Sequence, residues 1–326
     1  MGLDLDRMLE KCRRDQWRIR DLDWSVKPKA LSAEDEIAVV QYFTDMAGIE
    51  RLAAALFAEQ RRRVEDPRLK EIFATFIVDE ERHAQVAERL AAFYDVHHYR
   101  TYRMNDNLVR FRPYFIDAIR YLSAEIANAY ITSGEILLDV ALLRSLNDFV
   151  DDDMSHQAMD RINRDESRHI AVDFHMVEQY CDPEYIAREA KAKRLGLKDQ
   201  LRRAYTFCGM LYTAGPFLRD VFFAPMDLTD PSGKRMMEAF RRIQLMARKK
   251  EVAARPFTRF LRTLQILFNN PVIGRVAGSL IARVVGVDPR VLVELFDEED
   301  ERRVNRMSLQ DLAEEILALK NEPALG

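Results

Sequence analysis

The feature that most limits what this chain can fold into is a pentapeptide, Asp-Glu-x-Arg-His, which occurs twice, at residues 79–83 and 165–169. Around each copy, apolar residues recur at steps of three and four, the period of one face of an α-helix. These residues are Leu69, Phe73, Phe76, Ala87 and Leu90 in the first stripe, and Ala158, Ile162, Val172 and Met176 in the second. The Glu and the His of each copy lie in the middle of the stripe, so each pair is predicted to face the core.

Two further carboxylates lie in helical stripes of the same kind. Glu50 is flanked by Phe43, Ala47, Ala54 and Phe57, and Glu135 by Asn128, Thr132, Leu138 and Leu142. Glu80 follows Glu50 by 30 positions, and Glu166 follows Glu135 by 31. Each half of this region therefore reads as a helix with one carboxylate followed by a helix with Glu-x-x-His. Two such antiparallel pairs predict a four-helix bundle.

Four carboxylates buried together repel one another and lose hydration unless a cation neutralises them. Glutamates from two helices and Glu-x-x-His from two others are the ligands of a di-metal centre in a helical bundle. The predicted metal ligands are Glu50, Glu80, His83, Glu135, Glu166 and His169. Oxygen and nitrogen ligands favour iron or manganese over metals that prefer thiolates. Two iron ions are the predicted cofactor, and a mixed manganese–iron pair stays open.

The third helix offers one alternative ligand, Glu125. It lies ten positions before Glu135, about 80° away around an ideal helix, and it breaks the equal spacing of the two halves. Glu135 is therefore the preferred ligand. A single Glu-x-x-His is more often an ordinary helix-surface pair than a metal site, and it is the duplication that favours the metal.

Helix signals organise the rest of the chain, and nothing reads as a strand. Ser32 caps a helix to about residue 63, and Asp66-Pro67 opens a second to about residue 93. A loop over 95–112, a third helix over 114–149 and a fourth over 153–180 follow. The prediction is an all-α protein with three parts: an irregular N-terminal segment (1–31), the four-helix bundle (32–180), and additional helices packed on it (181–326).

The full pattern, Glu50…Asp79-Glu80-x-x-His83…Glu135…Asp165-Glu166-x-x-His169, resembles the ferritin-like di-iron carboxylate superfamily over roughly residues 35–180. The doubled Asp-Glu-x-Arg-His is similar to soluble acyl-carrier-protein desaturases. The doubled Glu, about thirty residues, Asp-Glu-x-x-His is similar to the p-aminobenzoate N-oxygenase family. Those N-oxygenases carry a third histidine ligand one turn before the second motif, where this chain has Ile162.

The resemblance also implies roles for the residues beside the ligands. Asp165 would orient His83 and Asp79 would orient His169, because a metal-bound imidazole normally donates its second N–H to a carboxylate. Arg82 and Arg168 would then hold these aspartates. A solvent-facing position is an equally good interpretation of the two arginines.

The resemblance implies an enzyme that uses O₂ and an external electron donor to hydroxylate, desaturate or N-oxygenate an organic substrate, free or tethered to an acyl carrier. The alternative is iron handling, meaning ferritin-like or rubrerythrin-like storage, ferroxidase or peroxide scavenging. The additional helices over 181–326 favour the enzyme, because they could build a substrate cavity that storage does not need.

Residues 234–290 are rich in arginine and lysine, with phenylalanines between them. This stretch could bind an acidic carrier protein, a phosphorylated carrier or an anionic membrane surface. An equally good interpretation is a helix face that balances the acidic run at 297–301.

The net charge of −4 and the absence of a recognisable reading motif predict no nucleic-acid partner. Three scattered cysteines and no apolar leader predict a cytoplasmic protein. A homodimer stays open.

Overall fold

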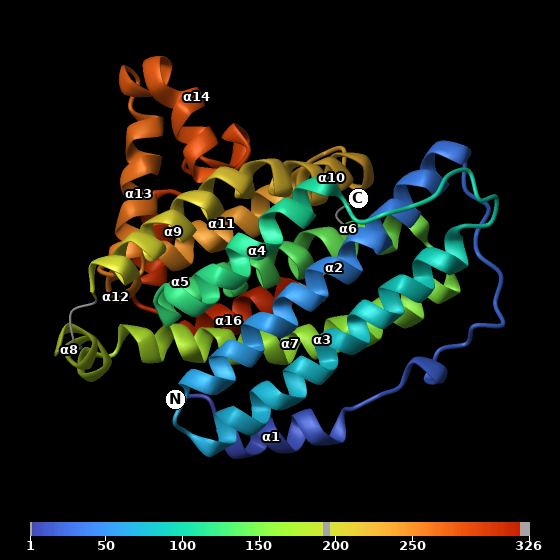
Figure 1. The fold of residues 1–326 in the computed structure, drawn as a ribbon, viewed down its shortest axis with the longest axis horizontal. Helices are drawn as coiled ribbons and strands as arrows, with labels where there is room; N and C mark the ends of the chain where they lie inside the picture. Colours follow the sequence, from blue (N-terminus) through green and yellow to red (C-terminus); the bar gives the residue numbers. More distant parts are fainter. Residues whose placement is uncertain (1, 192–195, 320–326) are drawn as a thin grey trace.

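A computed structural model describes residues 2–191 and 196–319, and every regular element in these two ranges is a helix (Figure 1). The predicted all-α class is therefore confirmed. Four helical segments, all with buried faces, surround the acidic residues singled out above. Their bounds follow from local signals that can be read along the chain.

The first pair consists of α2 (Ala33–Arg63) and α3 (Pro67–Tyr94), which pack against each other along their length. Ser32 Oγ accepts a hydrogen bond from the backbone N–H of Asp35 at 3.1 Å, and three acidic residues in the first turn complement the helix dipole. Asp66 caps α3, and Pro67 occupies its first turn. Both helices were predicted with nearly these bounds.

The third helix differs from its prediction. The range expected to be a loop, 95–112, already contains the start of α4 (Asp106–Tyr121), and a second helix, α5 (Ala124–Ile136), begins after a break. The break occurs because Leu122 and Ser123 adopt extended backbone angles, with Ser123 Oγ capping Ile126 N at 3.3 Å. A π-helical segment, η2 (Leu137–Leu142), then leads into α6 (Leu143–Val150).

The fourth helix, α7 (Asp153–Cys181), is capped by Asp152 and Ser155 in a reciprocal capping box. It packs against α5, α3 and the C-terminal α16 (Leu309–Leu319). α7 is followed by α8 (Pro183–Lys191). The predicted bounds of α7 are confirmed to within a residue or two.

The N-terminal segment contains more structure than predicted. Residues 1–31 were expected to be irregular, but α1 (Leu5–Arg14) and a short 3₁₀ turn, η1 (Ile19–Asp21), lie within them. Leu5, Met8 and Cys12 recur at steps of three and four, and they bury one face of α1 against the core below α3. In Figure 1 α1 lies alongside α3.

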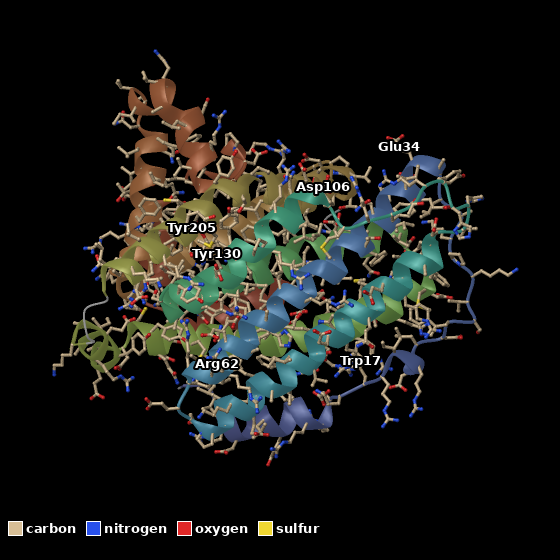
Figure 2. All side chains as sticks on the ribbon, in the orientation of Figure 1. Trp17, Glu34, Arg62, Asp106, Tyr130 and Tyr205 are labelled. Carbon is tan, nitrogen blue, oxygen red and sulfur yellow. The ribbon has the colours of Figure 1, made fainter. Side chains whose placement is uncertain are left out.

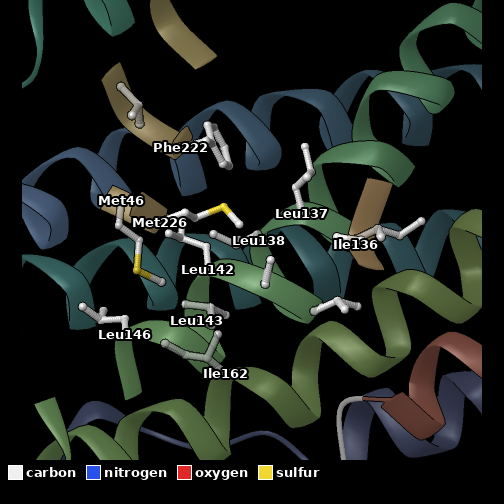
Figure 3. Packing of buried hydrophobic residues seen from close by; sticks show 14 of the residues in the cluster. Met46, Ile136, Leu137, Leu138, Leu142, Leu143, Leu146, Ile162, Phe222 and Met226 are labelled. Atoms are coloured by element: carbon white, nitrogen blue, oxygen red, sulfur yellow. The ribbon is translucent and has the colours of Figure 1, made fainter. Parts of the chain in front are cut away.

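The helices after residue 196 form an outer layer on the same core. They are α9 (Leu197–Leu218), η3 (Arg219–Phe223), α10 (Ala224–Thr229), α11 (Lys234–Arg248), α12 (Lys250–Ala253), α13 (Pro256–Asn269), α14 (Ile273–Val285), η4 (Pro289–Val291), α15 (Glu298–Val304) and α16. Phe222 and Met226 pack with Met46 and Leu142 from the inner helices (Figure 3). In Figure 1 α13 and α14 stand out at one corner of the molecule. The predicted division at residue 181 therefore crosses a continuous core.

About half of the basic side chains at 234–290 form ion pairs with acidic residues of the described chain. Arg241 contacts Asp300 at 2.7 Å, and Arg242 forms an ion pair with Glu315 of α16. The buried Lys249 ammonium donates to the carbonyl of Met307 at 2.6 Å. The acidic run at 297–301 thus provides the partner of Arg241, whereas Arg242 and Lys249 have partners outside that run. Binding to a carrier or membrane stays a prediction, without these residues as its surface.

One stretch of the described residues, Ala124–Val150, is long and apolar enough to cross a membrane. In the structure, 72% of the most apolar 18-residue part of this stretch is buried inside the protein. It therefore serves here as a core segment, which passes the same test of length and composition.

Candidate metal centre

The structure brings together all six residues that the spacing singled out. Glu50 comes from α2, Glu80 and His83 from α3, Glu135 from α5, and Glu166 and His169 from α7, and all are buried. Their ligand atoms form two groups, each within 4.8 Å, consisting of Glu50, Glu80, His83 and Glu166, and of Glu80, Glu135, Glu166 and His169. Because Glu80 and Glu166 belong to both groups, two cations bound there would share two carboxylates.

Both imidazoles turn the same nitrogen toward the carboxylates. His83 Nδ1 lies 3.1 Å from Glu166 Oε1, and His169 Nδ1 lies 3.0 Å from Glu80 Oε1 and 2.9 Å from Glu166 Oε2. The Nε2 atoms face away, toward the aspartates that precede the ligand glutamates. His83 and His169 therefore occupy equivalent positions on α3 and α7, as the sequence repeat requires.

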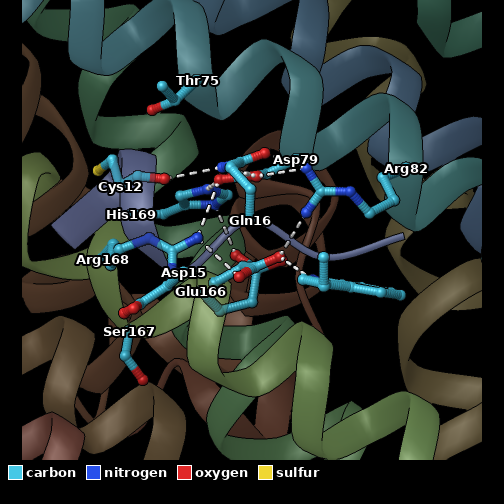
Figure 4. Close-up of polar contacts among 12 residues, drawn as sticks. Cys12, Asp15, Gln16, Thr75, Asp79, Arg82, Glu166, Ser167, Arg168 and His169 are labelled. Carbon is cyan, nitrogen blue, oxygen red and sulfur yellow. Dashed lines mark hydrogen bonds and ion pairs between the residues drawn. The ribbon is translucent and has the colours of Figure 1, made fainter. Parts of the chain in front are cut away.

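The two aspartates cross-link the motifs. Asp165 Oδ2 lies 3.1 Å from His83 Nε2, and Asp79 Oδ2 lies 3.6 Å from His169 Nε2. Arg168 donates to Asp79 at 3.1 Å and to Asp165 at 2.6 Å, and Arg82 contacts the same two carboxylates (Figure 4). Both arginines are buried, so these side chains do not form a solvated face. An aspartate that accepts from Nε2–H leaves the Nδ1 lone pair free for a cation.

The N-terminal segment supplies contacts that the sequence did not reveal. Trp17 Nε1 donates to Asp165 Oδ2 at 2.7 Å, and Gln16 Nε2 donates to Asp79 Oδ1 at 3.0 Å. The Arg82 guanidinium lies 5.1 Å from the centre of the Trp17 ring. Figure 2 shows Trp17 on the α3 side of the molecule. No spacing rule links residues 16–17 to either motif, and this is why they were missed.

Burial makes the carboxylates hard to ionise without a cation. It is the main cause that raises the pKa of Glu80 and Glu135 well above the usual range, and the neighbouring Glu166 raises both further. Burial also raises the pKa of Glu50 to about 7. In the metal-free protein these side chains therefore hold protons that a bound cation would displace.

The imidazoles respond in the opposite way. Burial alone would lower the pKa of His169, but Glu166 and Asp79 outweigh it and raise this pKa to about 9. Burial would raise the pKa of Asp79, but His169 and Arg168 lower it to about 2. Burial would also raise the pKa of Glu166, but His169 and His83 hold it well below its usual range. The metal-free centre thus contains imidazolium groups paired with carboxylates.

Many polar atoms here have no hydrogen-bond partner among the described residues. They include Glu50 Oε1, both carboxylate oxygens of Glu80, Glu135 Oε2, Glu166 Oε1 and His83 Nδ1. Such atoms are costly in a buried site, and nearly all native ones find a partner. Four ionised carboxylates balance the charge of two divalent cations, and the two Nδ1 atoms complete an oxygen–nitrogen set. The residues present therefore fit a pair of iron or manganese ions.

Asp173 is a further buried carboxylate that was missed. It follows His169 by four positions, neither of its carboxylate oxygens has a hydrogen-bond partner among the described residues, and burial raises its pKa well above the usual range. The three- and four-residue steps from Glu166 through His169 to Asp173 are the signal that could have found it. Tyr42 of α2 is also buried, and its hydroxyl has no hydrogen-bond partner in the described chain.

Glu125, the alternative ligand on the third helix, lies outside both groups. Its carboxylate pairs with Arg255 of the outer layer, which also contacts Glu189 at 2.7 Å. The preference for Glu135 thus agrees with the arrangement of the chain.

A cavity of about 340 Å³ reaches this centre from the outer layer. Glu50, Asn128 and Glu135 line it together with side chains from α4, α9, α11 and α13. Most of its lining residues are apolar, and Tyr130 of α5 is among them. Figure 2 labels Tyr130 on the side of the molecule nearer α13. An organic molecule in this cavity would contact two of the predicted metal ligands.

Comparison with known proteins assigns no family to the chain. No protein-family model, no curated protein and no solved structure matches it. The chemistry of the site therefore has to be inferred from its residues: a buried set of four glutamates and two histidines with room for two cations, beside an apolar cavity.

Proposed function

We propose that this protein is a non-haem di-iron oxidase or oxygenase that activates O₂ to hydroxylate, desaturate or N-oxygenate an organic substrate. In this proposal α2, α3, α5–α6 and α7 form a ferritin-like four-helix bundle. The metal pair is held by Glu50, Glu80, His83, Glu135, Glu166 and His169. Fe/Fe and Mn/Fe occupancy both suit this set.

The observation that carries the proposal is the cavity that ends on Glu50 and Glu135. An iron-storage centre needs a path for ions, whereas an apolar cavity of about 340 Å³ suits an organic molecule. About half of the lining residues come from segments outside the four helical segments that hold the acidic cluster. In this proposal the outer helices serve to form the substrate cavity, whereas iron storage would give them no such role.

Two reduced iron ions, when bound, would supply the electrons for O₂ activation, with an external donor restoring them. The chain's own contribution is orientation and exclusion of water. Asp165 is hydrogen-bonded to His83 Nε2, and Asp79 lies 3.6 Å from His169 Nε2. These contacts would fix which nitrogen of each ring faces the metal. The apolar walls keep bulk water away from Glu50 and Glu135.

The proposal is tested by metal content and O₂ consumption. The purified protein, loaded anaerobically, should hold about two metal ions per chain, and His83→Ala or His169→Ala should lower this number. His175→Ala is the matched control, because His175 also lies on α7 but contacts Gln179 outside the site. Metal analysis of the protein as isolated distinguishes Fe/Fe from Mn/Fe.

Reduced, iron-loaded protein should consume O₂ faster when a substrate occupies the cavity. Full occupancy in both histidine variants would rule out the site. Formation of a ferric mineral in a multi-subunit cage, with no organic molecule oxidised, would instead establish the iron-handling alternative.

A further inference from the structure

The cavity beside the centre has one polar feature that the proposed chemistry does not use. Arg262, on α13, lines the cavity together with Gln265 one turn later, while most other wall residues are apolar. Glu50 and Glu135 come from the inner helices α2 and α5. The cavity thus connects two carboxylates in the inner layer with a guanidinium in the outer layer.

Arg262 forms no ion pair and no hydrogen bond with any described residue, and its Nε is buried. The neighbouring cations are different. Arg255, the other arginine in the cavity wall, contacts two glutamates, and Arg248 contacts Glu294 at 2.8 Å. Arg262 is therefore the cation of the cavity wall, within the described chain, that lacks an acidic partner.

The surroundings only partly balance this charge. Burial lowers the pKa of Arg262 and the nearby Arg248 lowers it further, while Glu301 and Glu294 act in the opposite direction without forming an ion pair. Arg262 is half-buried, and Gln265 is buried. Its side-chain oxygen accepts from Arg248, whereas its amide nitrogen donates to no described residue. Arg262 and Gln265 thus present unused donors, which match a group that only accepts hydrogen bonds.

We infer that the cavity binds an amphiphilic molecule, an apolar chain with an anionic head, whose carboxylate or phosphate is held by Arg262 and Gln265. An anion paired with a guanidinium in two parallel hydrogen bonds gives a strong and oriented contact. With its head at α13, the apolar part extends inward along the phenylalanine-rich walls. The segment that reaches Glu50 and Glu135 is then hydrocarbon, which names the substrate class for the proposed function on which this inference rests.

The test measures binding, because binding does not require a working centre. Decanoate, decyl phosphate, decanol and decylamine are titrated by calorimetry into the full chain, both as isolated and after removal of metal by a chelator. Decanoate or decyl phosphate should bind at least about tenfold more tightly than decanol, because a charged hydrogen bond is lost in the alcohol. Whichever of the two anions binds more tightly identifies the head group.

Arg262→Gln keeps much of the side-chain volume and removes the charge. It should weaken binding of the anionic probe about tenfold and leave decanol unchanged. Arg259→Gln is the matched control, one turn earlier on the same helix, exposed and outside the cavity wall. Arg262→Glu should reverse the preference, so that decylamine binds more tightly than decanoate.

The hydrocarbon part has its own signature. Affinity should rise about fourfold for each added methylene from hexanoate to decanoate, the increment expected for transfer of CH₂ into an apolar cavity. A flat series would show that the chain stays in solvent and would overturn the inference.

Equal binding of decanoate, decyl phosphate and decanol to the wild-type protein would also overturn it, whatever the variants do. So would an Arg262→Gln variant that binds the anionic probe as the Arg259→Gln control does. The metal measurement is separate. If the chain holds no metal but binds the anion through Arg262, the binding site stands and the proposed oxidase function fails.

Discussion

At the scale of single residues, the centre depends on which way two imidazole rings face. Asp165 and Asp79 determine this, and each aspartate is itself held by a donor from the N-terminal segment. Trp17 Nε1 and His83 Nε2 both contact Asp165 Oδ2, so a single carboxylate oxygen links the tryptophan to a proposed metal ligand. Removing the Trp17 Nε1–H should therefore affect the His83 imidazole, to which it is connected only through Asp165.

Trp17→Phe keeps an aromatic ring under Arg82 and removes the N–H that Asp165 accepts. We expect the affinity for the first-bound metal to fall about tenfold, because partners of a ligating histidine tune its orientation and basicity. A competition titration with a metal-binding dye measures the change. Trp24→Phe is the control, since Trp24 Nε1 donates to the carbonyl of Ile19 and Trp24 stacks on Arg89, away from the cluster. Equal losses in the two variants would contradict a specific role for Trp17.

The difference between Glu135 and Trp17 shows what a sequence can reveal at this scale. Glu135 was identifiable because its helix repeats the spacing of the first pair, and helical period fixes which side chains share a face. Trp17 meets Asp165 across 148 positions, through a segment with no period. Asp173 follows His169 by one helical turn, so the helical period could have identified it. The contacts of Gln16 and Trp17, in contrast, could be found only from the three-dimensional structure.

At the scale of elements, the backbones of α9 and of the residue after α14 come very close to each other in the outer layer. The Cα atom of Gly286, just after α14, lies where a Cβ on Gly215 of α9 would come within 3.2 Å. Gly286 has φ of 77°, in the left-handed region that ends many helices. Val285 and Val287, on either side, line the cavity. The position of the cavity wall thus depends on two glycines.

Gly286→Ala should lower the melting temperature, since the left-handed conformation costs an alanine about 1–2 kcal/mol. Its Cβ would also meet the backbone N of Gly215 at 2.8 Å. Gly278→Ala is the control within α14. Its Cβ would make an ordinary contact at 3.5 Å, and alanine should stabilise the helix by about 0.5–1 kcal/mol. Metal content should not change in either variant. A Gly286→Ala protein that melts with the wild type would contradict the expected strain.

Elements were predictable where the chain carries strong caps, as at Ser32, Asp66 and Asp152. The break between α4 and α5 was not, although Ser123 is a good capping residue, because the apolar pattern runs through it without interruption. The two sides of the break pack differently: α4 packs against α9, and α5 packs against α7, contacts between segments far apart in the chain. Periodicity carries no information about such a contact.

At the scale of the whole molecule, the acidic centre makes stability depend on pH. Glu50 has a folded pKa of about 7, above its ordinary 4.5, and His169 has one of about 9, above 6.5. Both groups therefore bind protons more tightly in the folded chain than in the unfolded chain. By linkage, their stabilising contribution is present at low pH and is lost as pH rises, over about 4.5 to 7 for Glu50 and 6.5 to 9 for His169.

Chelator-treated protein should accordingly melt at lower temperature as the pH is raised from about 5 to 9. Metal-loaded protein should not follow this trend, because its ligands are already deprotonated and metal affinity rises with pH. Differential scanning calorimetry of both forms measures the two slopes. In the metal-free protein, Glu50→Gln should make the melting temperature depend less on pH between about 5 and 7. A metal-free protein that gains stability over this range would have the opposite proton linkage.

The contact between Trp17 and Asp165 also sets an order of events during biosynthesis. Translation runs from the N-terminus, so α1 leaves the ribosome first and α7 much later. A nascent chain that ends before residue 165 contains one Glu-x-x-His and three of the four glutamates. Gln16 can already meet Asp79 of the first motif, but Trp17 has no partner until Asp165 of the second motif has been made. The Trp17 contact thus forms late although Trp17 itself precedes every inner helix, and it can form only on a chain in which α7 has been made.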